Sequence, residues 1–191
     1  MQDPKVILLV SGKRKSGKDF ICEKLKTKLG ENICSIIRIS GPLKGLYASL
    51  HKLDLLELMS DSPYKEKHRL NMIKWSEGER DKDNGYFCRA ACAEATVTPV
   101  WIVSDIRRKS DIEWFKETYR GITKTVRISA DLDTRKNRGW KFTKDVDDAP
   151  SECDLDDFNA WDIMLDNNNT QQLETAIITV LEFLHIYTNN V

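Results

Sequence analysis

The sequence has no excess of charge of either sign. Its 191 residues include 30 Lys and Arg residues and 30 Asp and Glu residues, so the formal net charge is zero. A chain without net charge creates no global field that would draw it to nucleic acid or to an acidic membrane surface. We therefore expect neither partner, and any basic function has to be local.

Cysteine and histidine are also scarce, and their spacing excludes common roles of both residue types. The 5 cysteines are odd in number and form no CxxC pair, which argues against a disulfide framework and a zinc site. The 3 histidines, His51, His68 and His185, do not have the spacing of metal ligands. We expect reduced thiols, an intracellular protein and no metal chemistry through histidine.

Long apolar runs, internal repeats and low-complexity segments are missing as well. No apolar stretch approaches the length of a membrane span, and Met1 to Lys5 lack the apolar core of a secretory signal. We expect a cytosolic protein that does not enter a membrane. With 40% hydrophobic and 31% charged residues, the chain fits one globular domain over residues 1–191, which we expect to be a monomer.

Short apolar runs followed by turn residues are what the sequence does contain. Val6 to Val10 and Pro99 to Val103 are continuous apolar stretches, and such runs are typical of strands buried on both faces of a parallel sheet. Weaker strand patterns cover 33–39, 125–129 and 161–165. Because helical patterns separate these strands, the sequence predicts an α/β fold of three layers, α/β/α, with a central parallel sheet.

Two segments depart from this strand–helix alternation. Residues from about 43 to 95 carry helical periodicity with few strand signals, so we expect a helical insertion that binds substrate. Residues from about 131 to 158 are polar and rich in charge, which indicates a mobile lid. The core then covers about 5–40, 97–130 and 159–187, and this layout is that of nucleoside monophosphate kinases.

A phosphate-binding loop follows the first strand. Gly12-Lys13-Arg14-Lys15-Ser16-Gly17-Lys18-Asp19 matches the pattern GxxxxGK between a buried strand and a helix, which is the context that the motif requires. Glycines let backbone N–H groups turn toward one anion, and the helix N-terminus adds partial positive charge. We therefore expect these eight residues to bind ATP and Lys18 to reach its terminal phosphates. Three basic residues within the loop indicate more phosphate charge than one nucleotide presents.

Asp19 stands where most such loops have Ser or Thr. A carboxylate is a hard oxygen ligand, so Asp19 is a candidate for holding Mg²⁺ directly or through water. The alternative is an acidic residue that only stabilises the N-terminus of the helix. Asp105 follows the strand that ends at Val103, in the position of a Walker B acid. It is the second candidate for binding Mg²⁺.

Basic residues indicate a second anion site beside the loop. Arg107 and Arg108 follow Asp105, and substrates of open α/β sheets bind at the carboxyl ends of strands. Paired guanidinium groups suit a small molecule with two anionic groups. Arg135 and Arg138 of the lid are spaced to close over a transferred phosphoryl group. The insertion adds five weaker candidates, namely Lys44, Lys65, Arg69, Arg80 and Arg89.

Several motifs in this order resemble the animal-type phosphomevalonate kinases. The resemblance runs from about Val6 to Leu184, and its motifs are Ser11 to Phe20, Ser40-Gly41-Pro42-Leu43-Lys44, Trp101 to Arg108, Arg138-Gly139-Trp140, Asp147-Asp148 and Ser151-Glu152-Cys153. It implies a fold like that of nucleoside monophosphate kinases. It also implies transfer of the γ-phosphoryl group of ATP, with Mg²⁺, to (R)-5-phosphomevalonate in the mevalonate route to isoprenoids and sterols. The Gly-Ser-rich motif of the unrelated galactokinase-like phosphomevalonate kinases is absent.

The resemblance also implies roles for single residues. Lys13 to Asp19, Arg138 and Asn168 are expected at ATP, although the family often has His at the position of Asn168. Arg80, Arg89, Arg107, Arg108 and Asn167 are expected at the acceptor substrate. From the resemblance, the phosphate-binding loop and the basic residues together, we expect five residues to act in catalysis, namely Lys13, Lys18, Asp19, Arg107 and Arg138.

Two other functions remain open from the residues themselves. A nucleoside monophosphate kinase would share the loop, but its insertion would hold a base pocket instead of an arginine cluster. A nucleotide-dependent switch or regulatory ATPase would also share the loop, and it would release phosphate without an acceptor. The basic residues that point to a second anion favour a small-molecule kinase.

Overall fold

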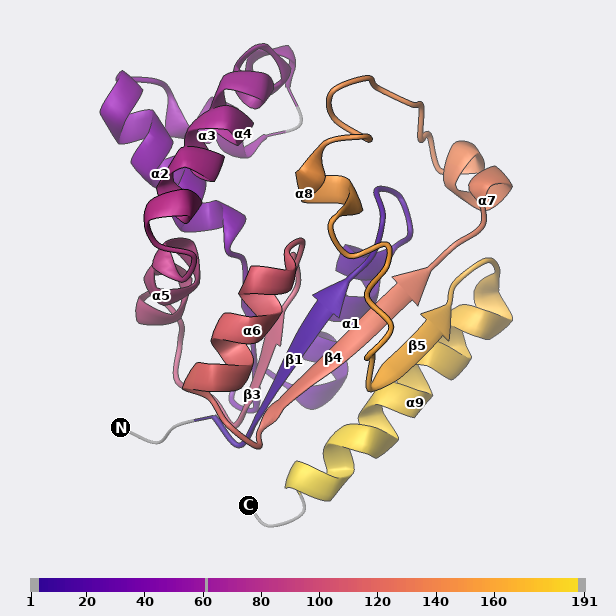
Figure 1. Ribbon diagram of the computed structural model, residues 1–191. Coiled ribbons are helices and arrows are strands. Elements are labelled where there is room, and N and C mark those ends of the chain that lie inside the picture. The colour runs from indigo at the N-terminus through magenta and orange to yellow at the C-terminus, as the bar shows by residue number, and fades with distance from the viewer. Residues whose placement is uncertain (1–3, 61, 189–191) are drawn as a thin grey trace.

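The computed structural model describes residues 4–60 and 62–188. One parallel sheet contains the strands in the order β2-β3-β1-β4-β5, and every neighbouring pair is parallel (Figure 1). The strands are β1 (Val6–Ser11), β2 (Cys34–Ile37), β3 (Val100–Val103), β4 (Thr123–Ser129) and β5 (Ile163–Asp166). The predicted α/β class with a central parallel sheet is confirmed.

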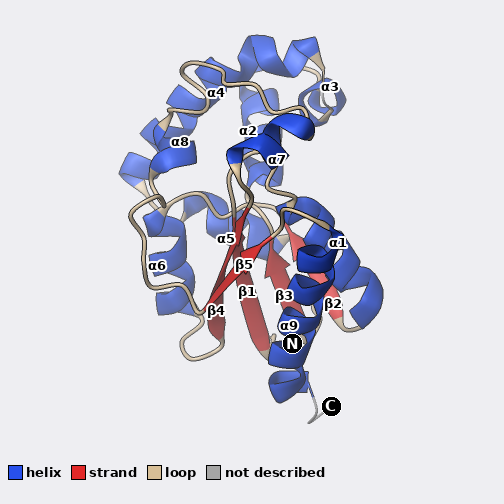
Figure 2. Cartoon of the chain, turned by 90° about the vertical axis from the view of Figure 1, so that its right-hand side faces the viewer, coloured by secondary structure: helices blue, strands red, loops and turns tan. Residues whose placement is uncertain are grey.

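Both faces of the sheet are covered by helices. Side chains of β1 alternate, so that Leu8 and Val10 pack toward α1 (Lys18–Leu29) and α9 (Thr170–Thr188). Ile7 and Leu9 pack on the other side, toward α5 (Tyr86–Ala93) and α6 (Lys109–Thr118). The three layers are visible edge-on in Figure 2. In the described part of the chain, no helix has the length and apolarity needed to cross a bilayer.

Between β2 and β3, the described residues form four consecutive helices. They are α2 (Ser40–His51), α3 (Leu55–Met59), α4 (Pro63–Lys82) and α5. Tyr47, Leu58 and Met72 form a small apolar core among the first three. Figure 1 shows that α2, α3 and α4 rise beyond the carboxyl ends of the strands. These helices therefore stand next to the edge of the sheet where the phosphate-binding loop lies.

The segment over residues 131–158 contains two short helices that apolar periodicity does not reveal. α7 (Leu132–Asn137) begins where the Asp131 side chain accepts a hydrogen bond from the Thr134 N–H, and α8 (Pro150–Cys153) begins with a proline. Neither helix buries a residue of its own. Because these helices depend on their first residues and not on an apolar stripe, the sequence pattern gives little sign of them.

Strand boundaries differ from the expected ranges for local reasons. β2 ends at Ile37 and not at Ile39, because the N–H groups of Ile39 and Ser40 donate to the carboxylate of Asp105. β4 begins at Thr123, since that residue pairs with β1. β5 begins at Ile163 because Trp161 packs against the ring of Phe158.

Candidate functional site

The loop over residues 12–17 joins β1 to α1 and requires glycine at both ends. A Cβ on Gly12 would lie 2.6 Å from the carbonyl oxygen of Ile128. Gly17 has a φ of +88°, and a Cβ there would lie 2.3 Å from Nδ2 of Asn167. Only glycine tolerates both the left-handed backbone and this close approach. The geometry leaves the N–H groups of the first turn of α1 without carbonyl partners inside the helix, as an anion site needs.

Lys18 and Asp19 are paired with each other at the start of α1. The Nζ atom of Lys18 lies 2.8 Å from Oδ1 and 2.9 Å from Oδ2 of Asp19. The Lys18 side chain is largely buried, while that of Asp19 is 63% exposed. The carboxylate therefore has room for a further ligand such as a cation. The hydroxyl of Ser16 is buried and, among the described residues, has no hydrogen-bond partner, so the loop also retains an unused donor for a bound phosphate.

Two further cations of the loop, Lys13 and Arg14, are paired with residues of the segment 131–158. Nζ of Lys13 lies 2.6 Å from Oδ2 of Asp156 and donates to the carbonyl oxygen of Glu152 at 2.6 Å. Nη1 of Arg14 donates to Oδ2 of Asp147 at 2.9 Å. The segment thus lies across the loop. Its carboxylates form ion pairs with Lys13 and Arg14, two cations that would otherwise be available to a polyphosphate.

Two arginines of the same segment bind the backbone of the loop. Arg138 donates to the carbonyl oxygens of Ser16 at 3.1 Å and Asn167 at 2.8 Å. Arg135 donates from Nε to the carbonyl oxygen of Arg14 at 2.8 Å. Both guanidinium groups are therefore at the loop, and their hydrogen bonds hold its shape.

Asn167 and Asn168 connect the end of β5 to this arrangement. Asn167 is 2% exposed, and its Nδ2 donates to the carbonyl oxygen of Ser16 at 2.8 Å. Oδ1 of Asn168 accepts from the N–H of Asp131 at 2.7 Å. Asn167 thus holds the backbone of the phosphate-binding loop at Ser16, and Asn168 holds Asp131, the first residue of the segment 131–158.

Two neighbouring cavities form the candidate site, one at the loop and one beside it. The first, here called the loop cavity, has a volume of about 340 Å³ and is lined by residues 13–20 together with Lys65, Glu66, Arg69 and Arg107. The second, the basic cavity, has a volume of about 210 Å³ and lies between α2, α4, the end of β3 and α8. Lys65, Arg69 and Arg107 line both cavities. An anion in one cavity therefore lies close to an anion in the other.

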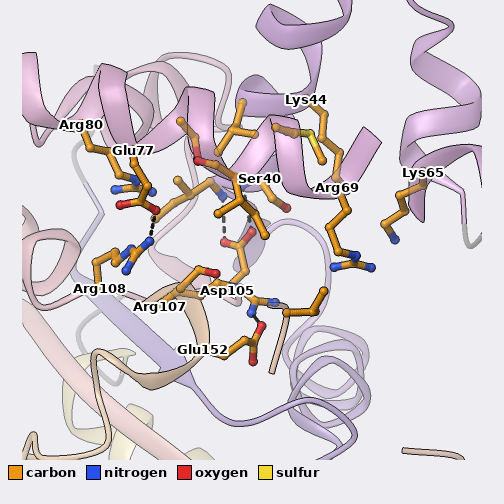
Figure 3. A pocket seen from close by; sticks show the side chains of 17 residues that line it. Ser40, Lys44, Lys65, Arg69, Glu77, Arg80, Asp105, Arg107, Arg108 and Glu152 are labelled. Carbon is orange, nitrogen blue, oxygen red and sulfur yellow. Dashed lines mark hydrogen bonds and ion pairs between the residues drawn. The ribbon is translucent and has the colours of Figure 1, made fainter. Parts of the chain in front are cut away.

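The basic cavity carries a strong excess of positive charge. Its lining includes six cations, Lys44, Lys65, Arg69, Arg80, Arg107 and Arg108, and three carboxylates, Glu77, Asp105 and Glu152. Figure 3 shows Lys65 and Arg69 at one end, Arg80, Glu77 and Arg108 at the other, and Asp105 and Arg107 between them. Burial lowers the pKa of Lys44, and the nearby charge of Lys65 lowers it further.

All four arginines that line the basic cavity have carboxylate partners, and Arg69 pairs with Glu66 at 2.5 Å. Arg80 pairs with Asp111 at 2.5 Å, Arg108 pairs with Glu77, and Arg107 pairs with Glu152. Such pairs hold the guanidinium groups in place while leaving other N–H donors of each group available, because a guanidinium carries five. The cavity is therefore lined by oriented arginines suited to an anionic ligand.

Comparison with known proteins identifies the family of the chain. The family model described as phosphomevalonate kinase matches residues 10–121. A Drosophila melanogaster protein named phosphomevalonate kinase is 50% identical over 182 residues, which cover 92% of this chain and 94% of that protein. The chain belongs to the phosphomevalonate kinase family. As a member of this family the chain is a kinase, and kinases of this family use ATP.

A solved structure supports the fold of this family member. The crystal structure of TT1252 from Thermus thermophilus aligns with 96% of the chain and 99% of its own length, with a TM-score of 0.56 and 16% sequence identity. At this identity the likeness concerns the fold alone.

The two cavities do not bring together every residue that was expected at the acceptor. Arg89 lies on α5 with a side chain that is 52% exposed, and it pairs with Asp83. It lines neither of the two cavities beside the loop. The other predicted acceptor residues of the insertion, Lys44, Lys65, Arg69 and Arg80, all line the basic cavity.

The two predicted magnesium residues differ in their surroundings. Asp105 lies at the end of β3, and its two oxygens accept from the N–H groups of Ile39 at 2.8 Å and Ser40 at 2.9 Å. It therefore fixes the start of α2, whereas Asp19 remains largely exposed. Within residues 4–60 and 62–188, no cluster of three or more His, Cys, Asp or Glu residues could hold a metal ion by itself. A cation here would need phosphate oxygens as further ligands.

Sequence reasoning missed several residues of the site. Glu77 and Glu152 line the basic cavity, and Arg127 donates to the hydroxyl of Ser11 at 2.9 Å beside the loop. Glu77 lies on a helix with many charged residues, so no pattern separates it from a solvated surface position. Glu152 lies in Ser151-Glu152-Cys153, and that motif was the available signal for it.

Proposed function

We propose that the chain transfers the γ-phosphoryl group of ATP to (R)-5-phosphomevalonate, forming (R)-5-diphosphomevalonate and ADP. The loop cavity would hold the phosphates of ATP, and the basic cavity would hold the acceptor. The observation that carries this proposal is that two cation-lined cavities share Lys65, Arg69 and Arg107. Phosphoryl transfer between two anions requires such adjacent cationic sites.

The charge of the basic cavity supports an acceptor of this kind. A phosphate monoester carries about −1.5 to −2 at neutral pH, and the carboxylate of phosphomevalonate adds one more negative charge. Six cations and three carboxylates line the cavity, which leaves an excess of three positive charges. The lining therefore has the sign of charge that an anionic acceptor needs, while Asp111 and Glu66 behind it also pair with Arg80 and Arg69.

The chemistry of this acceptor explains the type of residues present. The attacking atom is an oxygen of a phosphate group that is already largely ionised at neutral pH, so the reaction needs no general base. The main barrier is electrostatic, because two polyanions must come into contact. Lys18 and the N-terminus of α1 would stabilise charge on the transferring group, and Arg107, which lines both cavities, would hold donor and acceptor together.

The segment over residues 131–158 would serve as a lid. Lys13 contacts it through Glu152 and Asp156, and Arg138 reaches the loop from it. Closure would exclude water, which protects the γ-phosphoryl group from hydrolysis. ATP would have to displace lid carboxylates from Lys13 and Arg14, so that opening and closing accompany each turnover.

Mg²⁺ would accompany ATP, as is general for kinases, and would neutralise charge on its phosphates. Of the two candidates, Asp19 suits a ligand role because its carboxylate is exposed at the start of α1. Asp105 already accepts two backbone hydrogen bonds, which favours a role in placing α2. We further propose that the enzyme acts as a cytosolic monomer on small molecules, since both cavities are lined within one chain.

A nucleoside monophosphate kinase would need groups that recognise a base. The residues that line the basic cavity, as far as the structure describes them, include no aromatic ring and no side-chain amide. A coupled assay of ADP release with phosphomevalonate, mevalonate and AMP as separate acceptors tests the proposal. Turnover with phosphomevalonate alone is expected. Turnover with AMP, or phosphate release without any acceptor, would overturn it in favour of a nucleotide kinase or a regulatory ATPase.

A further inference from the structure

Asp111 is a buried carboxylate that lies behind the basic cavity, in the first turn of α6. Its side chain is 1% exposed. Oδ1 accepts from Nη1 of Arg80 at 2.5 Å and lies 3.6 Å from Sγ of Cys88. Oδ2 accepts from the N–H groups of Arg107 at 3.4 Å and Arg108 at 3.2 Å. One carboxylate therefore contacts three arginines that line the cavity.

These contacts join parts of the chain that are distant in sequence. Arg80 belongs to the last turn of α4 in the insertion, whereas Arg107 and Arg108 belong to the connection between β3 and α6 in the core. A carboxylate that only caps the start of α6 needs no more than the hydrogen bonds from these two backbone N–H groups. The additional ion pair with Arg80 is what links the insertion to the core.

Arg80 is held from two sides in this arrangement. Asp111 takes one of its N–H donors, and the ring of Phe87 lies 5.3 Å from its guanidinium carbon. The side chain of Arg80 is largely buried, so it cannot swing freely into solvent. A guanidinium held in this way loses little further freedom when it binds an anion, which favours tight recognition.

We propose that Asp111 is a positioning residue for acceptor recognition. Its carboxylate orients the side chain of Arg80 and fixes the backbone from which Arg107 and Arg108 extend, so that all three arginines meet the acceptor in one geometry. This inference rests on the proposed function, in which the basic cavity holds the acceptor. It assigns Asp111 no contact with the reacting atoms.

The test uses Asp111→Asn, which keeps an oxygen for the N–H groups of Arg107 and Arg108 but removes the charge that pairs with Arg80. We expect the KM for phosphomevalonate to rise about tenfold, the loss expected for one charge-assisted contact. The KM for ATP should stay within about twofold. Asp111→Ser provides a second variant, because a hydroxyl also accepts from backbone N–H groups. Glu113→Gln, on an exposed position of the same helix, is the matched control and should leave both constants unchanged.

A double-mutant cycle with Arg80→Met separates positioning from a structural role. If Asp111 acts through Arg80, adding Asp111→Asn to Arg80→Met should raise the acceptor KM by less than about twofold more. If Asp111 only caps α6, the two effects should multiply, and the inference is overturned. Wild-type acceptor KM in either folded Asp111 variant overturns it as well. So does failure of both variants to fold, because Asp111 would then serve the fold alone.

The same measurements distinguish failure of this inference from failure of the proposed function. If Arg80→Met and Arg107→Lys both leave the acceptor KM unchanged, the basic cavity does not bind the acceptor and the proposed site is wrong. If these two variants raise the acceptor KM while Asp111→Asn does not, the site stands and only the positioning role is lost.

Discussion

The ammonium group of Lys18 lies 2.8 Å from the carboxylate of its neighbour Asp19. In this arrangement the lysine of the phosphate-binding loop is neutralised before a nucleotide binds. ATP and its cation would separate the pair, because phosphate oxygens attract Lys18 and Mg²⁺ attracts Asp19. The pair therefore connects binding of the donor to the availability of the residue proposed to stabilise the transferring group.

Replacement of Lys18 should remove that stabilisation. Lys18→Met is expected to lower kcat about 100-fold to 1000-fold, the range typical of losing one electrostatic group that acts on the transition state. The affinity for ATP should fall much less, because the N–H groups of the loop remain. Steady-state kinetics and calorimetry measure the two effects. Lys28→Met, at the exposed end of α1, is the control, and near-normal turnover of Lys18→Met would contradict the proposed mechanism.

Removal of Arg138 should affect the donor side of the site. Its guanidinium donates to the carbonyl oxygens of Ser16 and Asn167, so Arg138→Ala should loosen both the loop and the lid. We expect kcat to fall at least about tenfold and the KM for ATP to rise. Calorimetry without nucleotide should show nearly unchanged binding of phosphomevalonate. An equal loss of acceptor binding would place Arg138 in the acceptor site instead.

Neutralising Glu152 should strengthen acceptor binding. Its carboxylate pairs with Arg107 and lines the basic cavity, where it competes with an anionic ligand. Glu152→Gln is expected to lower the Kd for phosphomevalonate about threefold to tenfold and to make this Kd more sensitive to salt. Asp157→Asn is the control, because Asp157 pairs with Lys109 outside both cavities. Weaker acceptor binding in Glu152→Gln would contradict this expectation. It would show that orienting Arg107 is the main effect of Glu152, and that competition with the acceptor for Arg107 is the smaller one.

The phosphate-binding loop and the alternation of strands and helices along the chain could be predicted because each depends on neighbours in sequence. A glycine-rich turn between an apolar run and a helix has few alternative structures, and Gly12 and Gly17 occupy the two positions where a Cβ would clash. The contact of Asn167 with Ser16 and the ion pair of Arg108 with Glu77 join distant segments. No spacing along the chain reveals such partners.

The contacts of residues 131–158 could not be predicted, for a different reason. The charged composition of this segment predicts a mobile lid, and the structure adds its partners, such as Asp147 paired with Arg14 of the loop. Composition records how many charges a segment carries and not which partners they find. The resemblance implies a contact of Arg89 with the acceptor, and this role stays a prediction, since the Arg89 side chain pairs with Asp83 outside both cavities.

The lowered pKa of Lys44 should make acceptor binding depend on pH. Its pKa lies below the ordinary value of 10.5, first because of burial and then because of Lys65. Binding of an anion favours the protonated amine, so the KM for phosphomevalonate should rise as pH increases through this lowered pKa. Lys44→Arg, which stays protonated, should lose this dependence. A parallel rise of KM in both proteins would assign the titration to another group.

The same shift gives a prediction for stability. Because the pKa of Lys44 is lower in the folded chain than in the unfolded chain, its charge opposes folding below the folded pKa. This cost disappears as pH rises from the folded toward the unfolded pKa. Lys44→Met should therefore raise Tm at neutral pH while weakening acceptor binding. Thermal melts near neutrality and at high pH test this, and a stabilisation that persists unchanged at high pH would contradict it.

Arg107 and Arg108 are adjacent, but their surroundings predict different responses to substitution by lysine. The Arg107 side chain is 37% exposed and lines both cavities, whereas that of Arg108 is 8% exposed and pairs with Glu77. Lysine keeps the charge but cannot reproduce bidentate contacts. Arg107→Lys should therefore cost roughly 1.5 to 3 kcal/mol of acceptor binding, or about tenfold to hundredfold in its KM, with little change in Tm.

Arg108→Lys should instead combine a smaller rise in acceptor KM with a lower Tm, because a buried guanidinium would lose its fit to Glu77. Kinetics with each substrate and thermal melting of both variants measure the contrast. Glu77→Gln should reproduce the loss of Tm seen in Arg108→Lys and leave the KM for ATP unchanged. If the two arginine variants gave the same kinetics and the same Tm, neither exposure nor the partner of each arginine would determine its role, and the division between recognition and structure would be wrong.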